Sequence, residues 1–193
     1  MVRRLISLLF MALTLADCGG SGPQFKNVDI TGADYGSDFA LTDHTGKMRR
    51  LEDFRGKVVV LFFGYTRCPD VCPTTLAELK AVKERLGPDG DRMQVLFVTV
   101  DPERDTRQLL ASYVPAFDPS FLGLRGDAAT TAKVAKDFKV YYQKVPGSTP
   151  DNYTIDHTAG SYVFDPQGRL RLFVRHGNAA NLAQDIETLL RAG

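Results

Sequence analysis

The hydrophobic pattern changes abruptly in the middle of the chain. The run Lys57–Phe63 is almost wholly apolar, with no alternation of polar residues, so it predicts a strand buried on both faces of a parallel or mixed sheet. Apolar residues then recur at helical spacing over Leu76–Leu86, which predicts a helix. The intervening stretch, Gly64–Thr75, is therefore expected where a central strand passes into a helix.

The rest of the pattern predicts a second buried strand and several shorter elements. The second strand is Met93–Val100, and a right-handed crossover through the helix makes it parallel to the first. Alternating apolar residues and turns rich in glycine and proline mark the others. These are a hairpin of Phe39–Thr42 and Met48–Leu51, helices Arg107–Tyr113 and Thr130–Phe138 around a strand Phe121–Leu124, a strand Val140–Val145, a hairpin of Ser161–Phe164 and Arg169–Arg175, and a helix Asn178–Leu190.

This order of elements predicts one α/β domain over residues 37–193, with a thioredoxin-like fold and the first hairpin as an N-terminal extension. Its core is a central mixed sheet flanked by helices. In that fold the first strand of the terminal hairpin runs antiparallel beside the central strand. The start of Ser161–Phe164 then meets the end of Lys57–Phe63. His157, which precedes the hairpin, is therefore expected close to Cys68.

Two of the three cysteines, Cys68 and Cys72, lie in the predicted junction. Pro73 suits the first position of a helix, and a residue that precedes proline avoids the α region, so Cys72 is expected at the helix cap. Both sulfurs would then lie near the positive end of the helix dipole, which favours thiolate over thiol. The thiolate is the form that attacks disulfides and binds metals.

The spacing of the cysteines, with three residues between them, leaves metal and redox chemistry both open. At i and i+4 on a regular helix, Cβ atoms lie roughly 5–6 Å apart, whereas a disulfide needs about 3.5–4.5 Å. A metal tolerates the wider gap, since each metal–sulfur bond is about 2.3 Å. Pro69 and Pro73 favour a loop, in which a disulfide can still form. A purely structural bridge is disfavoured, because such bridges usually close much longer loops.

Three ordered segments resemble the Sco/SenC family: Phe63–Thr74, Val98–Thr106, and Asp156–Thr158 leading into a strand. The resemblance runs from about Phe39 to the C-terminus. Members of this family are thioredoxin-like copper proteins that help to assemble the copper centre of cytochrome c oxidase. The resemblance implies that the chain carries copper outside the cytoplasm and delivers it to the copper-A subunit of the oxidase. A periplasmic copper donor is a further partner that this role implies.

The family motifs and the topology together imply that Cys68, Cys72 and His157 bind copper. Soft thiolates favour Cu(I), and a mixed sulfur–nitrogen set also accepts Cu(II). Thioredoxins usually carry a proline near the position of Ala159. Its replacement here favours a metal site over plain reductase activity.

Other polar residues around the predicted site have mainly structural interpretations. At the carboxyl end of Met93–Val100, Asp105 or Thr106 is expected to cap the next helix. Asp101, in the same segment, is expected to orient the site. Neither remaining histidine is expected to bind metal, because one lies in a solvated glycine turn and the other follows the last strand, at His44 and His176.

Thiol–disulfide exchange is the main alternative to metal delivery. In it, Cys68 and Cys72 are catalytic and reduce cysteines of the oxidase or of other exported proteins. Peroxiredoxins share the fold, but they carry a threonine three positions before the reactive cysteine, where this chain has Tyr65. A structural zinc site is disfavoured, because such sites normally have four protein ligands. A formal net charge of +1 without a basic run argues against a nucleic-acid partner.

The start of the chain has the pattern of an export signal. Arg3 and Arg4 precede the apolar run Leu5–Leu15, which fits the core of a signal peptide. That run is short for a bilayer-spanning helix, which needs about 20 apolar residues. Residues 1–18 are therefore expected as a signal and residues 19–36 as a flexible tether.

The signal ends in a sequence that resembles a bacterial lipoprotein signal, in which Cys18 becomes the lipidated N-terminus. Asp17 departs from that pattern, which normally has a small neutral residue before the cysteine. Lipidation would account for the odd cysteine and leave Cys68 and Cys72 as a pair. The protein is thus expected to be exported and attached to the membrane by a lipid or anchor, facing the periplasm.

Overall fold

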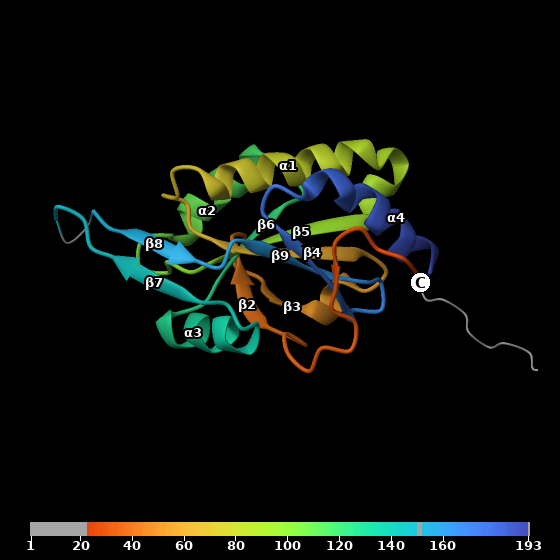
Figure 1. Cartoon of the computed structure of the whole chain (residues 1–193). Coiled ribbons are helices and arrows are strands. Elements are labelled where there is room, and N and C mark those ends of the chain that lie inside the picture. The colour runs from red at the N-terminus through yellow and green to blue at the C-terminus, as the bar shows by residue number, and fades with distance from the viewer. Residues whose placement is uncertain (1–22, 150–151, 193) are drawn as a thin grey trace, which may run out of the picture.

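The computed structural model of the chain describes residues 23–149 and 152–192. The strands of this part are β1 (Val28–Asp29), β2 (Ala40–Asp43), β3 (Met48–Arg50), β4 (Val58–Gly64), β5 (Met93–Thr99), β6 (Leu122–Arg125), β7 (Tyr142–Val145), β8 (Thr154–His157), β9 (Gly160–Phe164) and β10 (Leu170–Arg175). Eight of them form one sheet in the order β1-β10-β9-β4-β5-β6-β2-β3, whereas β7 and β8 form a separate two-stranded ribbon (Figure 1).

Helices cover both faces of the large sheet. The α-helices are α1 (Val71–Arg85), α2 (Arg107–Tyr113), α3 (Ala128–Asp137) and α4 (Leu182–Arg191). Of these, α1, α2 and α4 lie on one side of the sheet and α3 lies on the other (Figure 1). Short 3₁₀ helices are η1 (Leu51–Phe54), η2 (Gly87–Arg92), η3 (Val114–Ala116) and η4 (Ala179–Asn181). Within the described residues, no helix has the length and apolar character to cross a membrane.

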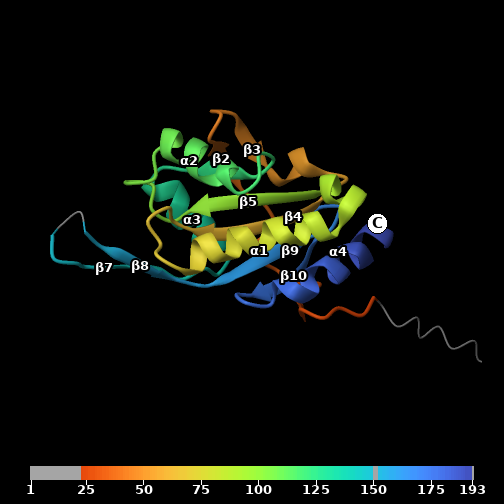
Figure 2. The ribbon, with the colours of Figure 1, turned by 90° about the horizontal axis from the view of Figure 1, so that it is seen from above.

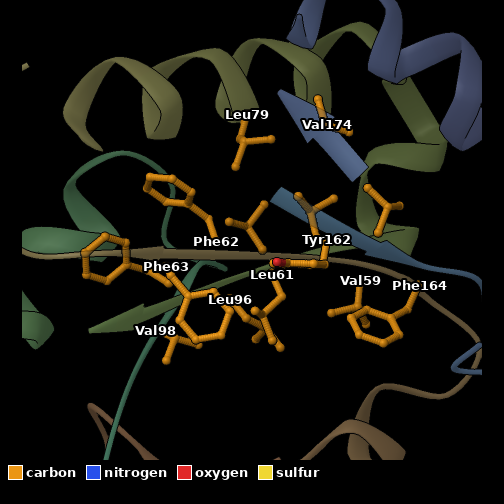
Figure 3. Close-up of a cluster of buried hydrophobic side chains, with 14 of the residues drawn as sticks. Val59, Leu61, Phe62, Phe63, Leu79, Leu96, Val98, Tyr162, Phe164 and Val174 are labelled. Atoms are coloured by element: carbon orange, nitrogen blue, oxygen red, sulfur yellow. The ribbon is translucent and has the colours of Figure 1, made fainter. Parts of the chain in front are cut away.

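The core is built around β4, as the apolar run in the sequence predicts. Every residue of β4 is buried, because β5 pairs with it in parallel on one edge and β9 pairs antiparallel on the other. Side chains of β4 alternate between the two faces of the sheet. Phe62 points toward Leu79 of α1, and Phe63 lies on the opposite face (Figure 3), where its ring packs 5.4 Å from that of Phe138.

The strand register places the predicted site at one edge of the sheet. Phe62 of β4 pairs with Ser161 of β9, so the end of β4 meets the start of β9, as predicted. The ribbon of β7 and β8 projects beyond this edge, next to the N-terminal end of α1 (Figure 2). The loop after β4 and the residues before β9 therefore lie side by side.

The ribbon is the main element that the sequence pattern does not predict. The sequence pattern predicts a short strand at Val140–Val145 and none at Thr154–His157. In the structure β7 pairs antiparallel with β8, and Tyr142 lies opposite His157. Most residues of the two strands are exposed, so they lack the apolar alternation that identifies a strand. His157 consequently lies at the end of a strand of the ribbon and not in a loop.

A short strand also precedes the predicted domain start at residue 37. Val28 and Asp29 form β1 and pair with β10. Just before it, the buried carboxylate of Asp185 on α4 accepts hydrogen bonds from the backbone N–H groups of Lys26 and Asn27, at 2.8 and 2.9 Å. The predicted signal, Cys18 and the first four residues of the predicted tether lie outside the described residues.

Candidate metal centre

Three side chains converge at the edge of the sheet where β4 ends. The Sγ atoms of Cys68 and Cys72 and a ring nitrogen of His157 all lie within 4.8 Å of one another. The Sγ of Cys72 is 3.6 Å from Nε2 of His157. Donors bound to one metal at about 2.0–2.3 Å lie roughly 3.5–4 Å apart. The residues that the sequence predicts as ligands therefore form a group that could hold a single ion after a small inward movement.

The two cysteines lie on either side of the start of α1, and neither forms a disulfide. The helix begins at Val71 with Asp70 as its N-cap residue, so the prediction that Cys72 caps the helix and Pro73 opens it is wrong by two positions. Proline is tolerated here because the first four N–H groups of a helix lack intrahelical acceptors. The Cys72 N–H instead approaches the Sγ of Cys68, at 3.4 Å.

The two thiols have different surroundings. Cys68 is partly exposed, whereas Cys72 is fully buried. Burial disfavours the charged form and raises the pKa of the Cys72 thiol well above its ordinary value. The prediction that the helix end favours a thiolate is therefore wrong for Cys72, because loss of solvent outweighs the helix dipole.

His157 presents one nitrogen to the cysteines. Its Nδ1 lies 3.1 Å from the carbonyl oxygen of Thr158, and a carbonyl only accepts, so Nδ1 carries the proton of the neutral ring. Nε2 is then the nitrogen with a free lone pair, and it is the one that faces Cys72. Burial lowers the pKa of His157 below its usual value, which keeps the imidazole neutral and able to bind a metal.

Two tyrosines that the sequence reasoning did not identify hold the strand that carries His157. The Tyr65 hydroxyl accepts the Ile155 N–H at 3.2 Å, and its ring packs edge-on against the imidazole. The Tyr153 ring lies 3.4 Å from the Arg104 guanidinium, and its hydroxyl donates to Asp101 at 2.7 Å. Asp101, which was predicted to orient the site, thus reaches it through Tyr153.

The sequence leaves open whether Asp105 or Thr106 caps α2, and the structure assigns the cap to Thr106. The Thr106 hydroxyl caps α2 by accepting the Leu109 N–H at 3.2 Å. Asp105 does not cap this helix. Its buried carboxylate accepts hydrogen bonds from Thr66, in the loop before Cys68, and from Thr99.

The other two histidines lie away from the cluster, as predicted. The Nδ1 of His44 accepts the Gly123 N–H at 3.1 Å, so His44 joins the β2–β3 turn to β6 and is less solvated than expected. The Nδ1 of His176 lies 3.0 Å from the Thr75 hydroxyl. Both contacts are structural.

A mixed sheet flanked by helices, with a Cys–Cys–His group at the end of its central strand, defines a thioredoxin-like protein with a candidate copper site. The family model described as SCO1/SenC matches residues 28–191. The chain therefore belongs to the SCO1/SenC family, and the resemblance seen in the three sequence segments is confirmed.

Individual relatives agree with this assignment. The mitochondrial SCO2 homolog of Bos taurus is 42% identical over 156 residues, which cover 80% of this chain and 58% of the bovine protein. The structure of Bradyrhizobium japonicum ScoI with copper bound has a TM-score of 0.71 and 42% identity, and covers 82% of this chain and 98% of that chain. The solution structure of apo Sco1 from Thermus thermophilus has a TM-score of 0.75 and 43% identity, and covers 90% of this chain and 99% of that chain. The thioredoxin-like fold is thus confirmed, and the chain spans less than two thirds of the bovine protein.

Proposed function

We propose that this protein is an exported copper chaperone that delivers copper to the copper-A centre of cytochrome c oxidase. The observation that carries the proposal is the convergence of Cys68, Cys72 and His157 within 4.8 Å. Two sulfurs and one imidazole form a soft, low-coordinate set that suits Cu(I) and also accepts Cu(II). Copper is the cargo of this site, so it must be held firmly enough to carry and loosely enough to release.

The different exposure of the two thiols gives an order to the transfer. Cys68 is partly exposed and Cys72 is buried, so a cysteine of the recipient reaches the metal from the Cys68 side. It displaces Cys68 first, and Cys72 and His157 follow as further ligands of the recipient bind. Each bond to the donor is replaced before the next is lost, so copper is never released to solvent.

The proposal includes export and a membrane attachment. Residues 1–18 have the pattern of a signal, and Cys18 is the proposed site of lipidation. The protein would then face the periplasm, take copper from a donor there and approach the oxidase subunit at the same membrane. Labelled palmitate should enter the wild-type protein and not a Cys18→Ala variant. Equal labelling of both, or of neither, would overturn the lipid attachment.

Thiol–disulfide exchange is the second candidate function, with Cys68 and Cys72 as its catalytic residues. The observation that favours it is that a partly exposed sulfur, Cys68, lies close to a buried one, Cys72. The backbone N–H of Cys72 donates to the Cys68 Sγ at 3.4 Å. An accessible thiol attacks, and a buried neighbour resolves the mixed disulfide. A His157→Ala variant that still reduces a protein disulfide at the wild-type rate without copper would favour this function.

An anaerobic Cu(I) titration of the reduced protein, followed by X-ray absorption, tests the main proposal. We expect one copper per chain with two sulfur ligands and one nitrogen ligand, and loss of the nitrogen in His157→Ala. His176→Ala is the matched control, because the His176 ring is hydrogen-bonded to the Thr75 hydroxyl and does not belong to the Cys–Cys–His group. Absence of tight copper binding, with both thiols intact, would overturn the chaperone function.

A further inference from the structure

Asp105 lies between β5 and α2, and its fully buried carboxylate faces the loop that carries Cys68. Its Oδ1 accepts the Thr66 hydroxyl at 2.6 Å. Its Oδ2 accepts the Thr66 N–H at 3.0 Å and the Thr99 hydroxyl at 2.6 Å. Asp105 therefore fixes Thr66 through hydrogen bonds to both its backbone N–H and its hydroxyl.

Thr66 occupies a key position in the Cys68 loop. The preceding residue, Tyr65, accepts the Ile155 N–H with its hydroxyl and so contacts the strand of His157. The carbonyl of Tyr65 accepts the Cys68 N–H at 3.2 Å. A shift of Thr66 would consequently move Cys68 relative to His157, although Thr66 contacts neither side chain directly in these hydrogen bonds.

We propose that Asp105 is a positioning residue for the metal site, which fixes Cys68 against Cys72 and His157 by holding Thr66. This inference rests on the proposed copper function and extends it to a residue that does not touch the metal. Residues around a metal's ligands commonly affect affinity by roughly 10–100-fold.

A carboxylate suits this contact because three donors converge on its two oxygens. The single oxygen of an asparagine can accept the Thr66 N–H and the Thr99 hydroxyl, but its NH₂ group must then donate to the Thr66 hydroxyl, so the contact loses its charge and one hydrogen bond is reversed. The donors to Asp105 are one backbone amide and two hydroxyls, all uncharged. Other buried carboxylates, Asp43 and Asp165, each pair with an arginine. A buried charge held by neutral donors alone is costly. Asp185 shares that feature, so what distinguishes Asp105 is its contact with the loop that carries Cys68.

The test compares Asp105→Asn with Asp185→Asn in the full chain, purified reduced in detergent. Asp185 is a matched control because it is equally buried and also accepts from neutral donors, the N–H groups of Lys26 and Asn27 and the Asn27 amide. It lies in the first turn of α4 and holds the segment before β1, not the cysteine loop. We expect Asp105→Asn to weaken Cu(I) binding roughly 10–100-fold and Asp185→Asn to leave it within about twofold.

Two substitutions of Thr66 keep the test decisive if Asp105→Asn does not fold. Thr66→Val removes the hydroxyl donor and should weaken copper binding, whereas Thr66→Ser retains the donor and should bind as the wild type does. The thiolate-to-copper absorption of the Cu(II) form should shift in Thr66→Val and not in Thr66→Ser. Equal affinity and equal spectra for Thr66→Val and the wild type would overturn the proposal.

A readout without copper separates this inference from the proposed function. Cys72 is fully buried, so a small alkylating reagent should reach it slowly in the wild type and in Asp185→Asn. Loosening of the loop in Asp105→Asn should speed its modification about tenfold or more. If the wild type binds no copper, the chaperone function fails and the alkylation rates still decide the role of Asp105. Unchanged rates, or equal acceleration by the two variants, would overturn that role.

Discussion

At the scale of single residues, Gly64 makes room for the Cys72 sulfur. A Cβ atom at Gly64 would lie 2.9 Å from the Cys72 Sγ and 2.8 Å from a ring carbon of Phe97. Both neighbours are fully buried, and cores are packed too densely to yield without loss of energy. The last residue of β4 therefore sets how close the helix-borne thiol comes to the sheet.

Replacement of this glycine should disturb the metal site directly. We expect Gly64→Ala to displace the Cys72 sulfur and to weaken Cu(I) binding about tenfold, with a loss of stability of roughly 1–3 kcal/mol from overpacking. Competition titration with a Cu(I) chelator measures the affinity. Gly123→Ala is the control, because its Cβ would crowd Leu110 and Val114 at 3.1 Å and should lower stability alone. A Gly64→Ala variant with wild-type affinity would contradict this role.

The protonation of the ligands predicts how copper binding depends on pH. Because burial raises the pKa of Cys72, copper must displace its proton, and affinity should fall about tenfold per pH unit for each thiol proton displaced. Burial lowers the pKa of His157, so protonation of the imidazole should weaken binding further only below its ordinary pKa of about 6.5. Cu(I) affinities at several pH values check this. His157→Ala should keep the thiol slope and lose the additional decline, and a flat affinity in acid would contradict the ligand set.

The sequence predicts which residues form the candidate site better than it predicts their protonation. Cys68 and Cys72 lie four positions apart in one motif, and strand topology brings His157 to them. The protonation of Cys72 depends on burial beneath Gly64 and the rings around it, which no local pattern encodes. Tyr153 and Asp105 are equally hard to foresee, because each acts through a contact with a segment remote in sequence, 52 residues away for Tyr153 and Asp101 and 39 for Asp105 and Thr66.

At the scale of elements, the ribbon of β7 and β8 carries His157 and has its own attachment to the domain. Tyr153 provides it, since its ring centroid lies 3.4 Å from the guanidinium carbon of Arg104, in the segment after β5. Lys144, on β7 of the ribbon, lies 4.8 Å from the same ring. The Arg104 side chain also donates to the Tyr153 carbonyl at 2.8 Å. The strand of His157 is thus tied to the segment after β5, in addition to its contact with Tyr65 of the cysteine loop.

Removal of the Tyr153 hydroxyl should loosen the ribbon without removing the ring. We expect Tyr153→Phe to lose the hydrogen bond to Asp101, worth roughly 1.5–3 kcal/mol for a charged acceptor, and to weaken Cu(I) binding severalfold through His157. Hydrogen exchange should become faster in β8. The control is Tyr141→Phe, whose exposed side chain lies just before β7, the other strand of the ribbon. Equal exchange rates in Tyr153→Phe and the wild type would contradict the attachment.

Elements with a strong hydrophobic pattern are predictable and weakly patterned ones are not. The predicted strands Lys57–Phe63 and Ser161–Phe164 agree closely with β4 and β9. Strands buried on both faces are recognisable because their residues are apolar without interruption. In the ribbon, β7 and β8 stabilise each other by pairing, and Tyr153 attaches them to the domain. The short strand β1 is stabilised by pairing with β10. Neither has an apolar face of its own, so their formation depends on contacts that the local sequence does not contain.

At the scale of the whole molecule, folding creates the proposed metal site from distant parts of the chain. Cys68 and Cys72 remain neighbours in the unfolded chain, but His157 lies 85 residues beyond Cys72. It joins the cysteines only when β9 pairs with β4 and the ribbon forms beside them. Copper that uses all three ligands therefore binds the folded state more tightly than the unfolded state, and linkage requires that it stabilise the fold.

The stabilisation should depend on His157 in a measurable way. At free Cu(I) of about 100 times the Kd, a ligand specific for the folded state adds about 2.7 kcal/mol to the free energy of unfolding. The gain should be smaller here, because the unfolded chain still offers two thiols in one short segment. His157→Ala reduces the difference between folded and unfolded sites to those thiols, so most of the gain should disappear, whereas His176→Ala should retain it. Urea unfolding in a Cu(I) buffer measures all three proteins. Equal stabilisation of His157→Ala and the wild type would mean that the cysteines alone hold the metal, and that the approach of β8 to the cysteine loop serves the fold and not the copper.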